Sequence, residues 1–241
     1  MRRGARAAVD LVYPPSCAAC SAATDQPHAL CPACWSSVPW IERPYCERLG
    51  TPFAVDLGEG LLSPGAISAP PAFERARAVA RYDGLGRELV HKLKYGDRMD
   101  LAPMMGRWMA RAGRDVLAEA DLVVPTPLHR GRLWRRRMNQ AAALASVVAR
   151  ASDRELALDC LERRRPTRSQ VGLTRNERAE NLQGAFACTP AGALRLRGRR
   201  VLLVDDVMTT GSTANVASRA LLRGGAAAVD VLTFASVCRP A

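Results

Sequence analysis

The stretch VLLVDDVMTTGST, residues 201–213, combines two kinds of binding chemistry. Its four apolar residues predict a strand buried on both faces. Asp205 and Asp206 follow, and carboxylates accept hydrogen bonds from a pair of vicinal hydroxyls. The next residues precede a predicted helix, whose N–H groups and dipole favour a phosphate. These residues are Thr209, Thr210, Gly211, Ser212 and Thr213. A ribose 5-phosphate satisfies both halves of the stretch.

Two common phosphate-binding motifs are absent from this stretch. It contains neither G-x-x-x-x-G-K-[ST] nor G-x-G-x-x-G, so it is neither a nucleoside-triphosphatase P-loop nor a dinucleotide-binding turn. A buried strand that ends in solvated acids before an ordinary capped helix stays open as the structural alternative.

A second group of residues has the spacing of a metal site. CAAC and CPAC, with ten residues between them, contain Cys17, Cys20, Cys31 and Cys34. Two such knuckles bring four thiolates into the tetrahedron that structural Zn²⁺ prefers. A redox pair or incidental thiols are the alternatives. Cys46 is interpreted as a spare thiol, because Leu49 stands where a second cysteine would complete another knuckle.

Charge and composition give weaker indications. The 241 residues carry a net charge of +12, which favours polyanionic partners such as nucleic acid or phosphorylated metabolites. Only Lys92 and Lys94 among 35 basic residues are lysines, an arginine skew typical of GC-rich coding. Two lysines in HKLKYG suggest that a compact ammonium matters there, and their spacing allows at most one to face a site. No membrane-spanning run or signal peptide is apparent, so we expect a cytoplasmic protein.

The elements that would position these residues follow a strand–helix alternation. Apolar strands without polar alternation predict a parallel sheet covered on both faces, an α/β doubly wound fold. Ligands of such sheets lie beyond the carboxyl ends of the strands. The Gly-, Pro- and Ser-rich stretch 51–71 predicts a linker between a zinc-binding module, 1–50, and the main domain, 72–241. The predicted strands are 74–83, 121–128, 198–207 and 228–238, and the predicted helices are 86–96, 100–120, 136–152 and 212–225.

Several motifs together carry a resemblance to a known family. Residues 201–213 closely resemble the phosphoribosyl pyrophosphate motif of type I phosphoribosyltransferases. With the C-x-x-C module, KLKYG, VPTPLHRGRLWRRRMNQ and TRSQVGLTRNERAENLQGAF, nearly the whole chain resembles the ComF family. Arg137 and Met138 replace the usual Gly-Phe pair of that family, and the second cysteine often found after Cys46 is missing. The resemblance implies a type I phosphoribosyltransferase fold, an N-terminal zinc ribbon and a link to DNA uptake in competent bacteria.

The resemblance also implies roles for further residues. Asp205 and Asp206 would hold the ribose hydroxyls, and residues 209–213 the 5-phosphate. A loop after an earlier strand would hold the pyrophosphate, through Thr126, Pro127, Leu128, Arg130 and Arg132. The stretch 161–186 would be a hood over the ligand, in which the matching family positions are Thr167, Gln170, Arg178 and Asn181.

Two functional hypotheses follow. The first is a phosphoribosyltransferase that binds phosphoribosyl pyrophosphate with Mg²⁺ and transfers the phosphoribosyl group to an unidentified acceptor. The second is a non-catalytic protein that senses phosphoribosyl pyrophosphate or a nucleotide while its zinc module and arginine-rich loops contact single-stranded DNA or a partner such as a helicase. An aromatic content of 5% offers few stacking platforms for single strands. The sequence leaves open whether the protein is an enzyme.

Overall fold

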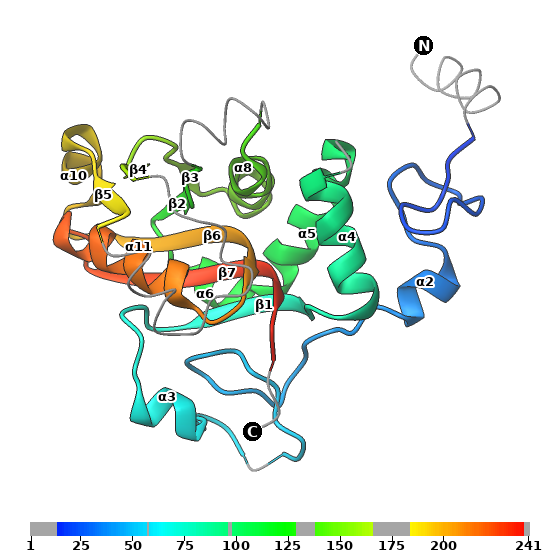
Figure 1. The fold of residues 1–241 in the computed structure, drawn as a ribbon, viewed down its shortest axis with the longest axis horizontal. Coiled ribbons are helices and arrows are strands. Elements are labelled where there is room, and N and C mark those ends of the chain that lie inside the picture. The colour runs from blue at the N-terminus through cyan, green and yellow to red at the C-terminus, as the bar shows by residue number, and fades with distance from the viewer. Residues whose placement is uncertain (1–13, 57, 96–97, 129–137, 166–183, 239–241) are drawn as a thin grey trace.

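The fold is built around a five-stranded sheet in strand order β1-β7-β6-β2-β3, in which the four strand pairings are parallel (Figure 1). It is seen in a computed structural model that describes residues 14–56, 58–95, 98–128, 138–165 and 184–238. The strands are β1 (Ala76–Arg81), β2 (Leu122–Pro125), β3 (Glu155–Leu156), β6 (Arg200–Met208) and β7 (Ala228–Ser236). The predicted parallel α/β sheet is therefore confirmed.

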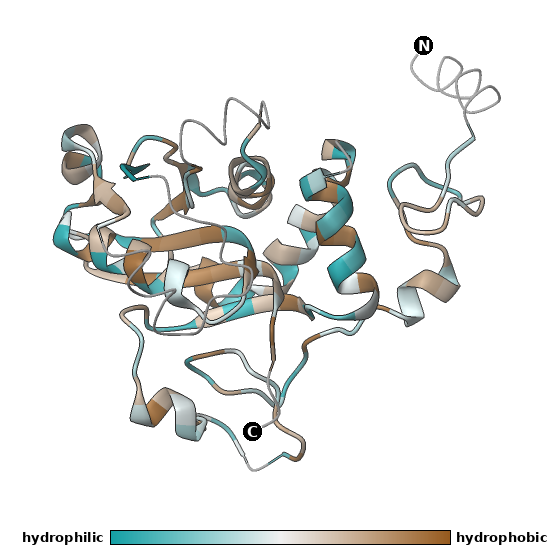
Figure 2. Ribbon diagram, viewed as in Figure 1, coloured by the Kyte–Doolittle hydropathy of each residue, from teal (hydrophilic) through white to brown (hydrophobic). Residues whose placement is uncertain are grey.

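The central strands are apolar because both of their faces are covered. Leu202 and Val204 belong to one core cluster and Val201 and Leu203 to the other, as the two-residue period of a strand requires. All four are fully buried. Figure 2 shows the resulting hydrophobic colour of the central strands against the mixed colour of the helices around them.

Helices cover the two faces unequally. Residues of α4 (Gly84–Tyr95), α5 (Ala102–Ala112), α6 (Arg114–Glu119) and α8 (Gln140–Ser152) form the first core cluster. A short 3-10 helix, Met99–Leu101, precedes α5. The other cluster contains α11 (Ser212–Arg223), α10 (Pro190–Leu196) and an antiparallel hairpin of β4 (Leu161–Arg163) and β5 (Phe186–Cys188).

Most predicted elements are present, with differences that have physical reasons. The single helix expected over 100–120 is divided at Gly113, where a Cβ would lie 2.8 Å from the Leu232 side chain. The strand expected over 121–128 ends at Pro125. The expected helix 136–152 is described from residue 140 onward. β3, β4, β5 and α10 were not predicted, because two to seven residues are too few to show a period.

The N-terminal module lies along the outer edge of β1. Backbone hydrogen bonds run from Ile41 N to Val79 O (2.9 Å), from Arg81 N to Pro39 O (2.8 Å) and from Ala76 N to the Arg48 carbonyl (2.8 Å). They pair groups that an exposed edge strand would leave open. Two short helices precede β1: α2 (Pro32–Ser36) lies in the predicted module and α3 (Pro64–Ser68) in the predicted linker.

The division into a module (1–50), a linker (51–71) and a main domain (72–241) stays a prediction. Within the described residues, no helix is long and apolar enough to cross a membrane.

Gly50 provides a test of the contact between the module and β1. Its φ is +64°, and a Cβ would lie 2.5 Å from the Ala76 carbonyl oxygen. We expect Gly50→Ala to lower the free energy of unfolding by about 2 kcal/mol or more, since left-handed backbone and a backbone clash act together. Urea unfolding followed by circular dichroism measures the change.

Gly65→Ala is the matched control, because a Cβ at Gly65 meets nothing within 4 Å. Equal stability of the two variants would contradict the tight contact at Gly50.

Candidate functional site

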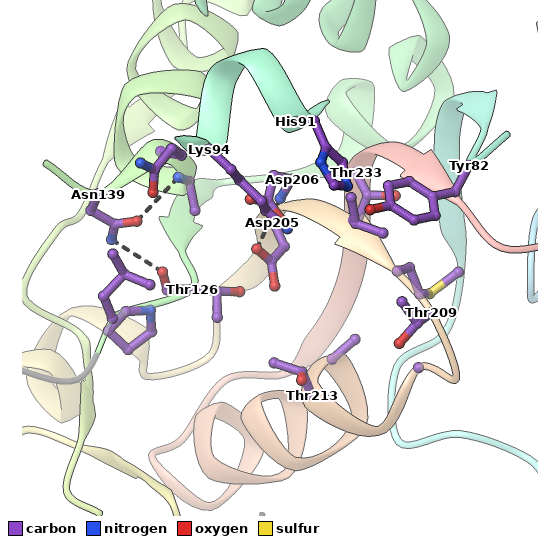
Figure 3. Close-up of a pocket in the computed structure, with 18 of the residues that line it drawn as sticks. Tyr82, His91, Lys94, Thr126, Asn139, Asp205, Asp206, Thr209, Thr213 and Thr233 are labelled. Atoms are coloured by element: carbon purple, nitrogen blue, oxygen red, sulfur yellow. Dashed lines mark hydrogen bonds and ion pairs between the residues drawn. The ribbon is translucent and has the colours of Figure 1, made fainter. Parts of the chain in front are cut away.

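A cavity of about 540 Å³ lies at the carboxyl end of β6, where open parallel sheets bind their ligands. Its lining includes Asp205 and Asp206, the start of α11 and the loop after β2 (Figure 3). The sheet brings these parts together because β2 and β7 both pair with β6 in parallel, so their carboxyl ends meet at one edge.

The two carboxylates belong to opposite faces of β6. Asp206 continues the alternation of Leu202 and Val204, toward the side of α4, and Asp205 continues that of Val201 and Leu203. In agreement, Lys94 of α4 forms an ion pair with Asp206, with 2.9 Å between Nζ and Oδ1. Asp205 accepts a hydrogen bond from the Asp206 N–H at 2.8 Å.

The charges in this group depend on one another. Burial, and then the charge of Asp206, raise the pKa of Asp205 from 3.8 to about 7. Burial alone would lower the pKa of Lys94, but the charges of Asp206 and Asp205 raise it above its ordinary value. Lys94 is therefore a fixed cation beside the two acids. Near neutral pH, Asp205 titrates while Lys94 stays charged.

The loop 209–213 leads into the N-terminus of α11. Gly211 is the N-cap residue at φ +75°, and it provides no side-chain cap to the first-turn N–H groups. The Thr210 and Ser212 hydroxyl oxygens lie 2.8 Å apart. Thr209, Gly211 and Thr213 line the cavity. The Ser212 N–H donates to Thr210 Oγ1 at 3.4 Å. A helix start with a glycine N-cap and hydroxyls around it is suited to an anion.

The loop after β2 forms the opposite wall of the cavity. Thr126, Pro127 and Leu128 all line it. Asn139 fixes the loop, since its Nδ2 donates to the Thr126 carbonyl at 3.1 Å while its Oδ1 accepts from the Ala141 N–H at 3.1 Å (Figure 3). One side chain thus caps α8 and orients the loop.

Two buried hydroxyls in the cavity wall lack hydrogen-bond partners among the residues that the structure describes. They are Thr126 Oγ1 and Thr233 Oγ1, and both residues are at most 5% exposed. The Thr126 hydroxyl is close enough to Asp205 to favour its charged form, but not in the geometry of a hydrogen bond. A buried hydroxyl without a partner costs free energy, so these groups favour a polar ligand in the cavity.

Other predicted residues lie elsewhere or outside the described residues. Lys92 does not line the cavity, and instead donates to the carbonyls of Ala18 and Ala19 and pairs with Glu88. Arg130 and Arg132, predicted for the pyrophosphate loop, lie outside the described residues. The same holds for the predicted hood positions, Thr167, Gln170, Arg178 and Asn181.

Sequence reasoning missed one wall of the cavity. Tyr82, Arg87, His91 and Tyr95 line it together with Lys94. Arg87, His91 and Tyr95 recur every four residues along α4 and so share a helix face. That spacing was a readable signal, but only the folded sheet shows that this face looks toward Asp205 and Asp206. Figure 3 shows Tyr82 and His91 on the side of the cavity opposite Thr126.

The four cysteines of the N-terminal module meet as predicted. Their Sγ atoms all lie within 4.8 Å of one another. The Cys20 and Cys31 sulfurs are 3.6 Å apart, close to the roughly 3.8 Å between ligands of a tetrahedral ion with Zn–S bonds of about 2.3 Å. The residues therefore fit a structural Zn²⁺, held by Cys17, Cys20, Cys31 and Cys34.

These thiols differ in how readily they ionise. Burial opposes ionisation of Cys17, but surrounding backbone N–H groups outweigh it and lower its pKa to about 6. Burial, and then hydrogen bonds with the neighbouring thiols, raise the pKa of Cys34 to about 12. Four thiolates at this distance need a positive ion among them, which a divalent metal supplies.

The first ribbon, residues 16–36, contacts α4 directly. Ala18 is 2% exposed and packs in the same core cluster as Leu89, Val90 and Leu93 of α4. The hydrogen bonds of Lys92 to the knuckle carbonyls add to this contact. Because the same helix carries Lys94, the ribbon is joined to the cavity through α4.

Two parts of the chain match known families. Residues 8–66 match the family described as double zinc ribbon domain, and residues 108–240 match the phosphoribosyl transferase domain. The chain is 32% identical over 220 residues to the DNA utilization protein YhgH of Escherichia coli K12, an alignment that covers 89% of this chain and 87% of that protein. The chain belongs to the ComF family.

A second relative has a similar extent. Competence protein F of Haemophilus influenzae is 28% identical to this chain over 212 residues, which cover 85% of this chain and 89% of that protein. Among solved structures, the allosteric regulatory enzyme of purine biosynthesis aligns with 60% of this chain and 30% of that chain, at 19% identity and a TM-score of 0.41. The matched families and the clustered thiols show that the ComF-family chain has a type I phosphoribosyltransferase-like sheet and an N-terminal zinc ribbon with four cysteines.

The raised pKa of Asp205 predicts how stability depends on pH. Between pH 3.8 and about 7 the folded state keeps a proton that the unfolded state releases, so the free energy of unfolding falls as pH rises through this range. Asp205→Asn removes that loss. We expect a melting temperature above that of the wild type at pH 8 and close to it at pH 4.5, measured by scanning calorimetry without ligand.

Asp153→Asn is the matched control, since Asp153 is exposed and its left-handed conformation, φ +53°, accepts asparagine. A wild-type and an Asp205→Asn protein with parallel pH profiles would contradict the assignment.

The contact between ribbon and α4 predicts an effect of metal removal. Chelation of zinc should loosen the knuckle at residues 17–20 and so increase amide hydrogen exchange in α4. Exchange in α10, Pro190–Leu196, which packs in the other cluster, should stay unchanged. Mass-spectrometric hydrogen exchange with and without chelator measures both, and unchanged exchange in α4 would show that ribbon and helix are independent.

Proposed function

We propose that this protein binds phosphoribosyl pyrophosphate with Mg²⁺ in the β6 cavity and transfers the phosphoribosyl group to an acceptor. One observation carries the proposal: two carboxylates and the N-terminus of α11, whose N-cap residue is a glycine, face the same cavity. Vicinal hydroxyls and a phosphate on one small molecule match these two groups. Membership of a family with a phosphoribosyl transferase domain supports the same ligand.

The cavity suggests how the ligand would lie. The 5-phosphate would take the N–H groups and hydroxyls of residues 209–213, and the ribose hydroxyls would donate to Asp205 and Asp206. The pyrophosphate would extend toward Thr126, whose buried hydroxyl can donate to it. Arg130 and Arg132 are proposed to bind the same group. Bound Mg²⁺ would supply positive charge to the pyrophosphate through oxygen ligands.

Lys94 has a defined part in this arrangement. Without ligand it neutralises Asp206, and it stays beside that carboxylate when hydroxyl donors arrive. A protonated Asp205 has one oxygen fewer to accept a hydrogen bond from a ribose hydroxyl. We therefore expect phosphoribosyl pyrophosphate to bind more tightly as pH rises through about 7. The protein therefore prepares one carboxylate with a fixed cation and leaves the other to titrate.

The proposed transfer breaks the bond between ribose C1 and the pyrophosphate oxygen, whose electron pair leaves with pyrophosphate. A lone pair of the acceptor forms the new bond to C1. The residues of the chain contribute by holding the ring and the leaving group in place. The hood positions Thr167, Gln170, Arg178 and Asn181 are proposed to exclude water during this step.

The relatives suggest a biological setting. YhgH is called a DNA utilization protein and its Haemophilus influenzae relative a competence protein. We propose that the present protein serves DNA uptake or use, with single-stranded DNA or a helicase of that machinery as its partner.

Calorimetric titration of the zinc-loaded protein with phosphoribosyl pyrophosphate and Mg²⁺ tests the proposal. We expect binding by the wild type and by Asp153→Asn, and a loss of about 100-fold or more in the Asp205→Asn/Asp206→Asn variant, because each lost hydrogen bond to a charged group costs about 1.5–3 kcal/mol. Absence of binding by the folded wild type would overturn the proposal.

A second measurement separates binding from turnover. Pyrophosphate release in the presence of candidate acceptors would support the transferase. Binding without release from any acceptor would instead favour the non-catalytic sensor.

A further inference from the structure

The described residues before β1 contain the same backbone pattern twice. In the first ribbon, residues 16–36, an antiparallel bridge joins Ser16 and Ala23. In the second, residues 45–68, the bridge joins Tyr45 and Pro52. In each ribbon a cysteine directly follows the first residue of the bridge. The cysteines are Cys17 and Cys46.

The knuckle turns after these cysteines are also alike. Cys17 N donates to Ala22 O at 2.7 Å, and Cys46 N donates to Thr51 O at 2.8 Å, five residues on in both cases. The residue four positions after each cysteine donates back to the cysteine carbonyl, at 3.0 Å and 2.8 Å. That residue has a φ of +65° in the first ribbon and +64° in the second, at Ser21 and Gly50.

The second halves of the two ribbons agree as well. α2 begins at Pro32 after Cys31, and α3 begins at Pro64 after Ser63, and both helices have five residues. The residue before each proline donates its N–H to the sulfur of the first cysteine in the same ribbon. These bonds run from Cys31 N to Cys17 Sγ at 3.3 Å and from Ser63 N to Cys46 Sγ at 3.2 Å. The two segments therefore share one fold.

This correspondence identifies the residues at the four ligand positions of the second ribbon. In the second ribbon, the positions of Cys17, Cys20, Cys31 and Cys34 are occupied, in the same order, by Cys46, Leu49, Ser63 and Ala66. Leu49 and Ala66 have no donor atom, and structural Zn²⁺ takes four sulfur or nitrogen ligands in a closed tetrahedron. The second ribbon does not fit a zinc ion, although the matched family is described as a double zinc ribbon.

Other contacts replace the metal in the second ribbon. Cys46 and Ala66 are fully buried, and Leu49, which corresponds to the exposed Cys20, is half-buried. The N–H groups of Leu49 and Ser63 both donate to the Cys46 sulfur, at 3.4 and 3.2 Å. Leu49 packs against the core cluster of the main domain. The centre of the second ribbon is thus closed, with Ser63 buried beside Cys46.

The sheet supplies further support to the second ribbon. Arg77 of β1 is 3% exposed and donates to the Glu47 carbonyl at 2.8 Å and to the Glu47 carboxylate at 2.7 Å. The Arg48 carbonyl accepts from Ala76 N at 2.8 Å. These bonds attach the knuckle of the second ribbon to the sheet.

We propose that the chain binds one zinc ion, in the first ribbon, and that the second ribbon is a metal-free copy of it, held by its buried centre and its contacts with β1. The two ribbons then have different tasks. The first contacts α4 and depends on metal, and the second covers the edge of β1 and does not.

Metal analysis of the purified full-length protein tests this proposal, and it is independent of the ligand in the β6 cavity. After zinc loading and removal of excess metal, we expect one tightly bound zinc ion per chain. Two ions per chain, or none, would overturn the proposal.

Two cysteine variants with the same chemical change locate the ion. We expect Cys34→Ser to lose tight zinc binding, seen as at least a roughly tenfold faster transfer of zinc to a chromogenic chelator. Cys46→Ser should keep one ion with the wild-type transfer rate. Loss of the ion from Cys46→Ser, with Cys34→Ser unaffected, would place the metal in the second ribbon and refute the assignment.

A third variant tests the residue correspondence itself. Leu49→Cys/Ser63→Cys/Ala66→Cys restores all four ligand positions of the second ribbon, and we expect it to bind two zinc ions per chain. A folded variant that binds only one ion would show that the two ribbons do not correspond. If the variant fails to fold, the zinc content of the wild type and of the two cysteine variants still decides the proposal.

Discussion

Two adjacent carboxylates at the end of a central strand repel each other, and the structure is arranged around this repulsion. Asp205 and Asp206 lie in a cavity where solvent screens their charges poorly. Lys94 compensates one of them at 2.9 Å and leaves the other with a pKa of about 7. Lys94 can do so only if α4 is held above the end of β6. The position of α4 therefore decides the charge of the cavity.

The N-terminal module contacts the same helix. Apolar residues of the helix share a core with Ala18 of the first zinc knuckle, and Lys92 binds the knuckle carbonyls. The two lysines of the chain thus lie on one helix and have different partners: Lys92 faces the ribbon and Lys94 faces the carboxylates. A cysteine cluster far earlier in the sequence is thus joined to the cavity through one helix.

The second ribbon supports the same sheet from its edge. Arg77, an almost fully buried arginine on β1, pairs with Glu47 of that ribbon and with Asp115 of α6. A buried charge needs a partner of opposite charge, so removal of both acids would leave an uncompensated guanidinium. This network joins the second ribbon to the main domain. It explains how the second ribbon can be held in place without a metal ion of its own.

The sequence by itself determined the local parts of this protein. Unalternated apolar runs indicated the parallel strands, and C-x-x-C pairs indicated the thiol cluster, because both signals depend on residues close together in the chain. The residues of 201–213 likewise indicated carboxylates next to a helix start. Short elements such as β3 and the β4–β5 hairpin gave no such signal, since their register depends on distant partners.

Only the tertiary structure decided which side chains share a space. Arg87, His91 and Tyr95 share one face of α4, and their spacing alone does not tell whether that face is buried or exposed. In the folded protein this face lines the cavity. Lys92 and Lys94 are two residues apart in the sequence and serve different sites. Leu49, Ser63 and Ala66 look unrelated to metal binding until the backbone places them at the ligand positions of a ribbon. Such relations are long-range contacts, and local sequence patterns do not encode them.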